Sequence, residues 1–381
     1  MLSIYRDVYE ELLTLNRGGE VKHFNNFLLV LLSFILLFFL GCQSQYITAG
    51  KIYIDQENYD AAIEQFKKAV EAEPQNHETY IWLGKAYAYR KLYEEACKQT
   101  EKGISLDPKK LDALKKDISF NYWAVFFNAG MKHVDNKEFD LALKRIERSL
   151  DFEPKSAQSL NYLAYCFIKL KRDDDAEKTY KKTIELVPDN VDTYVNLASF
   201  YRISEKKEEE EAILKKARKI VENPDWLKVE NEDILKQRKK ETSMVYIELG
   251  NVLLRHEKPE EAEKVLIKAI ELSPEDKDVN FNYGIALYEL NKYMDAVTPF
   301  KKVVLLDSLD KEGYYYLGAA YLKAEKYNDA IEACTKLLEI DPEYCEAYIN
   351  RAYAQRELGN TDAAYEDAEI GIECQKRREN K

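Results

Sequence analysis

Cysteines and histidines are the residues of this chain best suited to metal or redox chemistry. The 381 residues include six cysteines and four histidines. No CxxC pair occurs, and the histidines (His23, His77, His133 and His256) are scattered along the chain. This spacing argues against a metal site, and we expect neither a metal nor a cofactor.

Motifs of enzyme active sites are also missing from the sequence. It contains no GxSxG, phosphate loop, HExxH or dinucleotide fingerprint. Its formal net charge is −12 and it has no basic stripe, which argues against nucleic acid as a partner. We therefore expect neither enzymatic activity nor a small-molecule substrate.

Nine alanines recur at a nearly constant spacing and indicate the elements of the fold. The steps between them are 34, 46, 34, 36, 50, 34, 34 and 34 residues. A period of 34 residues is typical of stacked helix-turn-helix units, and the longer steps are then insertions. The alanines are Ala62, Ala96, Ala142, Ala176, Ala212, Ala262, Ala296, Ala330 and Ala364.

A small residue and a proline accompany most of these alanines. Glycine or alanine stands twelve residues before the alanine, as at Gly84, and proline stands twelve residues after it, as at Pro108. Small residues let paired helices approach closely, and proline marks the boundary between units. In the fifth unit the first distance is fourteen, from Ala198 to Ala212, which predicts two extra residues in the turn between the helices.

Large residues complete a pattern that resembles the tetratricopeptide repeat (TPR). The second unit has Tyr80, Leu83, Gly84 and Tyr87, and the eighth has Tyr314, Leu317, Gly318 and Tyr321. The resemblance covers about residues 43–378. It implies an all-α fold without strands, a right-handed superhelical solenoid of about nine helix pairs.

Two insertions, at residues 111–122 and 225–242, interrupt the array, and we predict both to be helical. Neither has a glycine or proline break before the next first helix, so Asn231 to Arg255 can form one long helix. We expect units 1–5 in residues 43–224 and units 6–9 in residues 243–378, as two lobes divided by the second insertion.

The resemblance also implies where a partner binds, because the first helices of such units line an inner groove. The predicted groove residues are Ile47, Lys51, Ile81, Lys85, Phe127, Met131, Tyr165, Ile247, Phe281, Tyr315, Ile349 and Tyr353. Most are apolar or aromatic, which favours an amphipathic or extended protein segment as the ligand. The alternative is that some of them fill gaps between neighbouring units.

Two finer expectations concern the chemistry of this groove. The carboxylate clamp of chaperone-binding family members is not evident, although Lys51 and Lys85 can contact one acidic group. Phe281, Tyr315 and Ile349 take the same place in three successive units, so we expect them to form a continuous apolar strip.

An apolar run of fourteen residues, 27–40, precedes the array. As a helix it spans about 21 Å, short of the roughly 30 Å hydrocarbon core, so its length favours a signal peptide (residues 21–41). The run ends at Gly41-Cys42, which resembles a bacterial lipobox and implies cleavage before Cys42 and lipidation of its thiol. An uncleaved membrane anchor is the alternative.

Residues 1–20 carry a net negative charge, unlike the front of a signal peptide. A start at Val21 would leave Lys22 and His23 before the apolar run, so we predict that residues 1–20 are a mis-assigned extension. Met1 as the true start is the alternative.

The remaining cysteines lie within the repeats. Cys166 and Cys334 take interior positions, where a free cysteine behaves as a small apolar residue. Cys345 opens the first helix of the last unit and Cys374 ends the second, so antiparallel packing brings them together. A disulfide between them and two free thiols both remain open.

These features together predict a non-enzymatic, lipid-anchored scaffold of the bacterial cell envelope that faces the periplasm or the exterior and binds other proteins. An adaptor with an uncleaved anchor, and a docking factor for an envelope enzyme, are the alternatives.

Overall fold

The computed structural model describes residues 45–379 of the chain, which form nineteen α-helices and no strand. The first helices of the nine units are α3 (Gln45–Asp55), α5 (His77–Tyr89), α8 (Tyr122–Asp135), α10 (Ala157–Lys169), α12 (Val191–Ile203), α14 (Glu232–Arg255), α16 (Lys277–Glu289), α18 (Lys311–Lys323) and α20 (Cys345–Glu357). The second helices are α4 (Tyr59–Ala72), α6 (Tyr93–Leu106), α9 (Phe139–Leu150), α11 (Asp173–Leu186), α13 (Lys207–Val221), α15 (Pro259–Leu272), α17 (Tyr293–Leu306), α19 (Tyr327–Ile340) and α21 (Thr361–Glu379).

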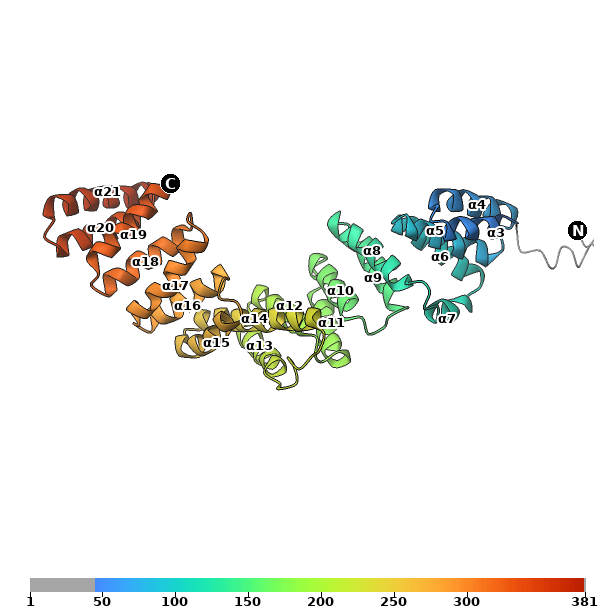
Figure 1. Ribbon diagram of the computed structural model, residues 1–381, viewed down its shortest axis with the longest axis horizontal. Helices are drawn as coiled ribbons and strands as arrows, with labels where there is room; N and C mark the ends of the chain where they lie inside the picture. The colour runs from blue at the N-terminus through green and yellow to red at the C-terminus, as the bar shows by residue number, and fades with distance from the viewer. Residues whose placement is uncertain (1–44, 380–381) are drawn as a thin grey trace, which may run out of the picture. The chain divides into compact units, whose positions relative to one another are not determined.

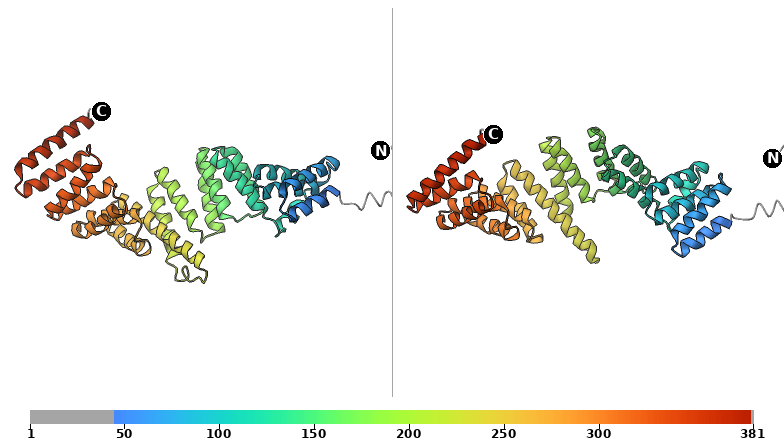
Figure 2. Two further views of the ribbon diagram at one scale, coloured as in Figure 1. Left: turned by 45° about the horizontal axis from the view of Figure 1, so that its top comes forward. Right: turned by 90° about the horizontal axis from the view of Figure 1, so that it is seen from above.

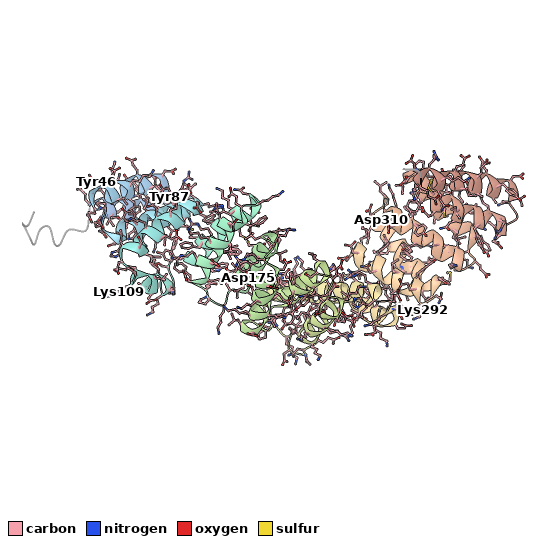
Figure 3. The ribbon with its side chains drawn as sticks, turned by 180° about the vertical axis from the view of Figure 1, so that it is seen from behind. Tyr46, Tyr87, Lys109, Asp175, Lys292 and Asp310 are labelled. Carbon is pink, nitrogen blue, oxygen red and sulfur yellow. A yellow bond between two sulfur atoms is a disulfide. The ribbon has the colours of Figure 1, made fainter. Side chains whose placement is uncertain are left out.

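Each unit is an antiparallel pair of helices, as Figure 1 shows for α20 and α21. Small residues bring the two helices together: a Cβ atom added to Gly50 of α3 would lie 2.5 Å from the ring of Phe66 in α4. The same cluster takes in Tyr46 of α3 and Tyr87 of α5 (Figure 3). Tyrosines at repeat positions therefore serve the packing of neighbouring helices.

The turn inside each unit has one residue with positive φ, between 56° and 81°. In eight units this residue lies five positions before the recurring alanine; in the fifth unit Glu205 lies five positions before Glu210. The prediction of two extra residues in that turn was therefore wrong. Glu210 takes the alanine's place and is 2% exposed, whereas Ala212 is exposed.

A buried glutamate is tolerated at this point because cations reach it from both neighbouring first helices. Arg202 of α12 lies 3.0 Å from the Glu210 carboxylate, and Arg255 of α14 donates a hydrogen bond of 2.7 Å to it. Both arginines are partly exposed, so their charges keep contact with water while they neutralise the buried acid.

The first insertion is only partly helical, unlike the prediction for residues 111–122. It contains one short helix, α7 (Lys110–Lys115). Beyond it, Asp117 accepts a hydrogen bond of 3.0 Å from the backbone N–H of Ser119, and Asn121 accepts one of 2.9 Å from that of Ala124. These side-chain caps favour a turn and a new helix start, and α8 begins at Tyr122.

The second insertion ends in the long helix that the sequence predicts. Asn231 caps α14, a helix of 24 residues drawn in yellow in Figure 2. The side chain of Trp226 anchors the preceding turn: its Nε1 donates a 3.0 Å hydrogen bond to Thr242, and the Arg238 guanidinium lies 4.6 Å from the ring centroid.

The chain divides into two compact units between Pro154 and Lys155. The expected division was the second insertion, at residues 225–242. Helix α14 explains the difference, because it runs without a break from this insertion into the sixth repeat and binds α13 through Glu210 and Glu211.

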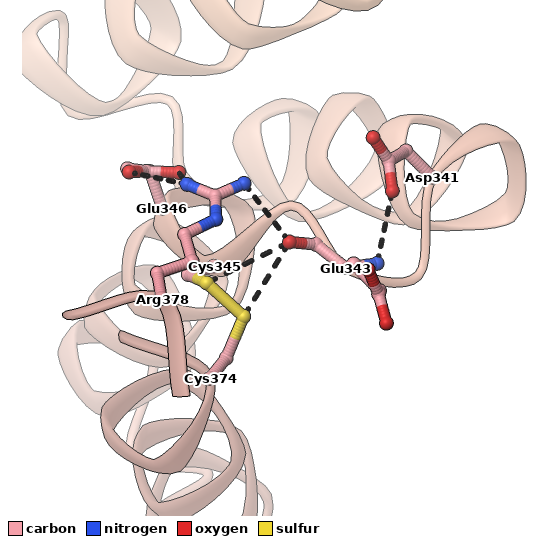
Figure 4. The surroundings of a disulfide bond; sticks show 6 residues. All are labelled: Asp341, Glu343, Cys345, Glu346, Cys374 and Arg378. Atoms are coloured by element: carbon pink, nitrogen blue, oxygen red, sulfur yellow. Dashed lines mark hydrogen bonds and ion pairs between the residues drawn. A yellow bond between two sulfur atoms is a disulfide. The ribbon is translucent and has the colours of Figure 1, made fainter. Parts of the chain in front are cut away.

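Cys345 and Cys374 form a disulfide with a Cα–Cα distance of 5.4 Å, which settles the alternative that the sequence left open. It joins the start of α20 to the end of α21 (Figure 4). The other cysteines in the described residues are buried: burial raises the pKa of Cys166 to about 11 and that of Cys334 to about 12. These thiols therefore stay protonated and unreactive near neutral pH.

Among residues 45–379, no helix has the length and apolar character needed to cross a bilayer. The apolar run 27–40, Cys42 and the proposed start at Val21 lie outside the described residues.

Candidate functional site

The predicted groove residues differ widely in their exposure. Ile47 is fully buried, and Ile81 and Phe127 are 8% and 4% exposed. Burial favours the packing alternative for these three, because none presents a free surface to a partner. Ile81 also packs against its own unit, where a Cβ atom on Gly103 would lie 2.7 Å from it.

Two predicted residues on the last first helix present the clearest apolar surface. Ile349 is 37% exposed and Tyr353 is 46% exposed, one helical turn apart on α20. The Arg356 guanidinium lies 4.8 Å from the ring centroid of Tyr353. Such a stripe offers an aliphatic contact, an aromatic ring and a neighbouring cation. Of the remaining predicted residues, Lys85 is buried and six are half-buried: Lys51, Met131, Tyr165, Ile247, Phe281 and Tyr315.

The expected strip of Phe281, Tyr315 and Ile349 is partly taken up by contacts within the array. The ring of Phe281 lies 5.5 Å from that of Tyr316, and the ring of Tyr315 lies 5.6 Å from that of Tyr344. The groove pattern did not include Tyr316 and Tyr344, which make these contacts. Of the predicted three, Ile349 is the most exposed, at 37%.

A second predicted location, in the first compact unit, centres on a tryptophan between two lysines. The ammonium of Lys51 lies 4.7 Å from the ring centroid of Trp82, and that of Lys85 lies 5.0 Å from it. Glu78 accepts hydrogen bonds from Lys51 at 2.9 Å and from the Trp82 indole at 3.2 Å. Cation–π contacts and these hydrogen bonds fix the ring between α3 and α5.

A residue of the first insertion, Asp117, pairs with the second lysine, Lys85. Lys85 is 8% exposed and donates a 2.8 Å hydrogen bond to Asp117, which follows α7. Partial burial opposes ionisation of Asp117, but hydrogen bonds from Lys85 and Ser119 outweigh it and hold the pKa of Asp117 below its ordinary value. The acidic group that meets Lys85 here comes from this chain, and Lys51 meets a different acid, Glu78.

Sequence reasoning missed Glu78, Trp82 and Asp117 at this location. The sequence could have indicated Glu78 and Trp82. They are four residues apart and share one face of their helix, and Lys51 belongs to the neighbouring unit. Asp117 was not, because nothing in the sequence fixes how the insertion folds back onto α5.

The helix pair α13 and α14 carries the densest ionic cluster of the second compact unit. Glu211 is 8% exposed and lies 2.7 Å from His256, 2.8 Å from Lys258 and 2.7 Å from Lys215. Burial raises the pKa of Glu211, but these hydrogen bonds prevail and lower it to about 2. Every acid here has basic partners, so the cluster joins helices. In the described part of the chain no three potential metal ligands gather at one point.

Family models for the tetratricopeptide repeat match the chain along most of the array. A TPR repeat model matches residues 50–90, and tetratricopeptide repeat models match 77–110, 127–191, 247–310, 312–344 and 333–366. Together these matches cover more than half of the chain.

Curated relatives match only a part of the chain. The human protein O-mannosyl-transferase TMTC3 is 24% identical over 202 residues, which are 49% of this chain and 20% of that protein. The mouse protein of the same name is 24% identical over 197 residues. The chain thus spans about a fifth of the length of these relatives.

Solved structures match about half of the chain or more. YrrB, described as a TPR protein with an unusual peptide-binding site, is 22% identical, covers 53% of this chain and 95% of its own, and has a TM-score of 0.43. PilF of Pseudomonas aeruginosa is 18% identical, covers 62% of this chain and 97% of its own, and has a TM-score of 0.46. The matched models and the nine helix pairs lead to one conclusion: this chain belongs to the tetratricopeptide repeat family.

Proposed function

We propose that this protein is a non-enzymatic scaffold that is anchored in the bacterial cell envelope and binds segments of partner proteins on the first helices of its repeats. The observation that carries the binding role is the stripe of Ile349 and Tyr353 on α20, which is apolar, partly exposed and set beside a cation. An amphipathic helix or an extended segment with apolar side chains at matching spacing suits this surface.

The disulfide between Cys345 and Cys374 supports an envelope location. Disulfides persist in oxidising compartments such as the periplasm and are rare in the cytosol. Together with the apolar run 27–40 that precedes Gly41-Cys42, this bond favours an exported chain that carries its lipid at Cys42. The diacylglyceryl group has two chains, and two chains suffice for stable anchoring.

The anchor is tested by replacing Cys42 with Ser and following the protein through cell fractionation and intact-mass analysis. We expect the wild-type protein in the membrane fraction at the mass of a lipidated chain that begins at Cys42, and the variant released or mislocalised. Equal membrane retention of the variant at the uncleaved mass would favour a spanning anchor instead.

Partner binding is tested by the double substitution Ile349→Ala and Tyr353→Ala. Both side chains are exposed, so the helix content should stay unchanged while capture of the partner weakens by roughly tenfold or more. Leu305→Ala is the matched control, because Leu305 is 76% exposed on the second helix α17. Equal capture by the wild type, the double variant and Leu305→Ala would contradict binding at this stripe but would leave the lipid anchor untouched.

A further inference from the structure

Two interfaces between neighbouring repeats share one pair of positions. The first is the residue directly after the recurring alanine, and the second is the residue two places after the small residue of the next first helix. Ile63 and Ala86 form such a pair in one apolar cluster, and Val297 and Ala320 form the equivalent pair in another. These side chains are between 0% and 8% exposed.

Helix α21 carries the first half of this interface, and within residues 45–379 no later helix supplies the second half. Tyr365 stands directly after Ala364 and is 77% exposed, whereas Val297 at the equivalent position is 6% exposed. Ile372, eight residues after Ala364, is 50% exposed. Leu338, eight residues after Ala330, is 8% exposed and clusters with Ala347 of α20.

Helix α3 carries the second half. Ile52 stands two places after Gly50 and is 51% exposed, whereas Ala86 and Ala320 at the equivalent position are fully buried. The interface also accepts a large side chain there, because Phe200 holds the same position in α12 and is only 4% exposed.

We propose that α21 of one molecule packs against α3 of a second copy, so that Tyr365 and Ile372 cover Ile52 and the repeat stack continues from one chain into the next. Both halves have the register of the Ile63–Ala86 and Val297–Ala320 interfaces, which singles out a second copy as the occupant. Large exposed apolar side chains that are buried on contact supply the affinity. The contact is heterologous, because two different surfaces meet.

A complementation experiment on the detergent-solubilised full chain tests this contact. Tyr365→Glu disrupts the surface on α21, and Ile52→Glu disrupts the surface on α3. Sedimentation velocity reports the size of the assemblies. We expect concentration-dependent association of the wild-type protein and a loss of roughly tenfold or more in association for each variant alone. An equimolar mixture of the two variants should form a 1:1 dimer, because each still offers the surface that the other lacks.

Each alternative gives a different pattern. A wild-type protein that stays monomeric, or a mixture without the 1:1 dimer, overturns the proposal. Ile52→Glu alone forming dimers as well as wild type would indicate two α21 helices in contact and would equally contradict it. Leu305→Glu, at an exposed site of 76% on α17, is the matched control and should associate like the wild type.

Discussion

In eight of the nine units, an alanine near the start of the second helix is packed in the interior. Ala176 and Ala262 are fully buried at this position. The fifth unit keeps the geometry of the turn but has Glu210 there, so the period of 34 residues continues from Ala176. The spacing of the turns determines the register, and the residue type at one position does not.

This register predicts that two alanine substitutions differ in their effect on the free energy of unfolding. Ala176→Leu should overpack the helix pair and destabilise the protein by about 1–3 kcal/mol. Ala212→Leu should change the free energy of unfolding by less than about 0.5 kcal/mol, because Ala212 is exposed. Urea unfolding monitored by circular dichroism measures both free energies. A large loss of stability for Ala212→Leu would support the original interpretation, in which the turn of the fifth unit has two extra residues.

Acid should weaken the ionic cluster around Glu211. Its pKa falls from an ordinary 4.5 to about 2 on folding, despite burial, because Lys215, Lys258 and His256 donate to it. A carboxylate with a depressed pKa contributes stability that is complete above its ordinary pKa and is lost as the pH falls through the folded value.

The measurement is the melting temperature of wild type and Glu211→Gln as a function of pH. The wild-type advantage should be constant near neutral pH and should shrink as the pH falls from 4.5 toward 2. An advantage that does not depend on pH in this window would mean that the interactions of the Glu211 carboxylate do not require its charge.

At the scale of elements, the disulfide closes the last helix pair. The Cys345–Cys374 bond spans 29 residues, and Arg378 beside it bonds Glu346 at 3.1 Å (Figure 4). Loss of a bond that closes such a loop costs about 2–4 kcal/mol, mainly because the unfolded chain gains freedom.

Reduction should therefore loosen the end of α21 first. We expect faster amide hydrogen exchange in the last turns of α21 after reduction, with little change in α16 and α17. A Cys345→Ser, Cys374→Ser double variant is the control and should exchange equally fast with and without reductant. Unchanged exchange in the reduced wild type would show that helix packing alone holds this end.

The second insertion depends on Trp226 for its place beside α14. Trp226 is 8% exposed, and its indole bonds Thr242 while Arg238 covers the ring. Trp226→Ala should cost about 3–5 kcal/mol locally and should raise the hydrogen exchange of residues 222–231. Protease cleavage confined to this segment would be an independent readout, and an unchanged digestion pattern would contradict the anchoring role.

Most of the fold could be predicted from the sequence, because alanine, glycine and proline recur at positions where helix packing demands them. The helix pairs and the long helix α14 follow from this pattern. The register of the fifth unit could not be predicted from residue type, because a glutamate, Glu210, takes the buried position and is paired there with Arg202 and Arg255. The contact of Asp117 with Lys85 depends on how the first insertion folds, which no periodicity determines.

At the scale of the whole molecule, the repeat array is a scaffold whose binding capacity lies in side chains that packing leaves free. Ile47 and Ile81 are needed inside the array, whereas Ile349 and Tyr353 are available on its surface. The same distinction applies to Tyr365 and Ile52, which occupy packing positions yet are exposed.

Site-specific photo-crosslinking in living cells tests the central claim most directly. A photoreactive residue is placed at Tyr353 on the first helix α20, and in a matched control at Leu305 on the second helix α17, which are 46% and 76% exposed. We expect a discrete adduct with a different protein from position 353 and none from position 305. No adduct at position 353, or the same adducts at both positions, would contradict a scaffold that binds its partners on the first helices.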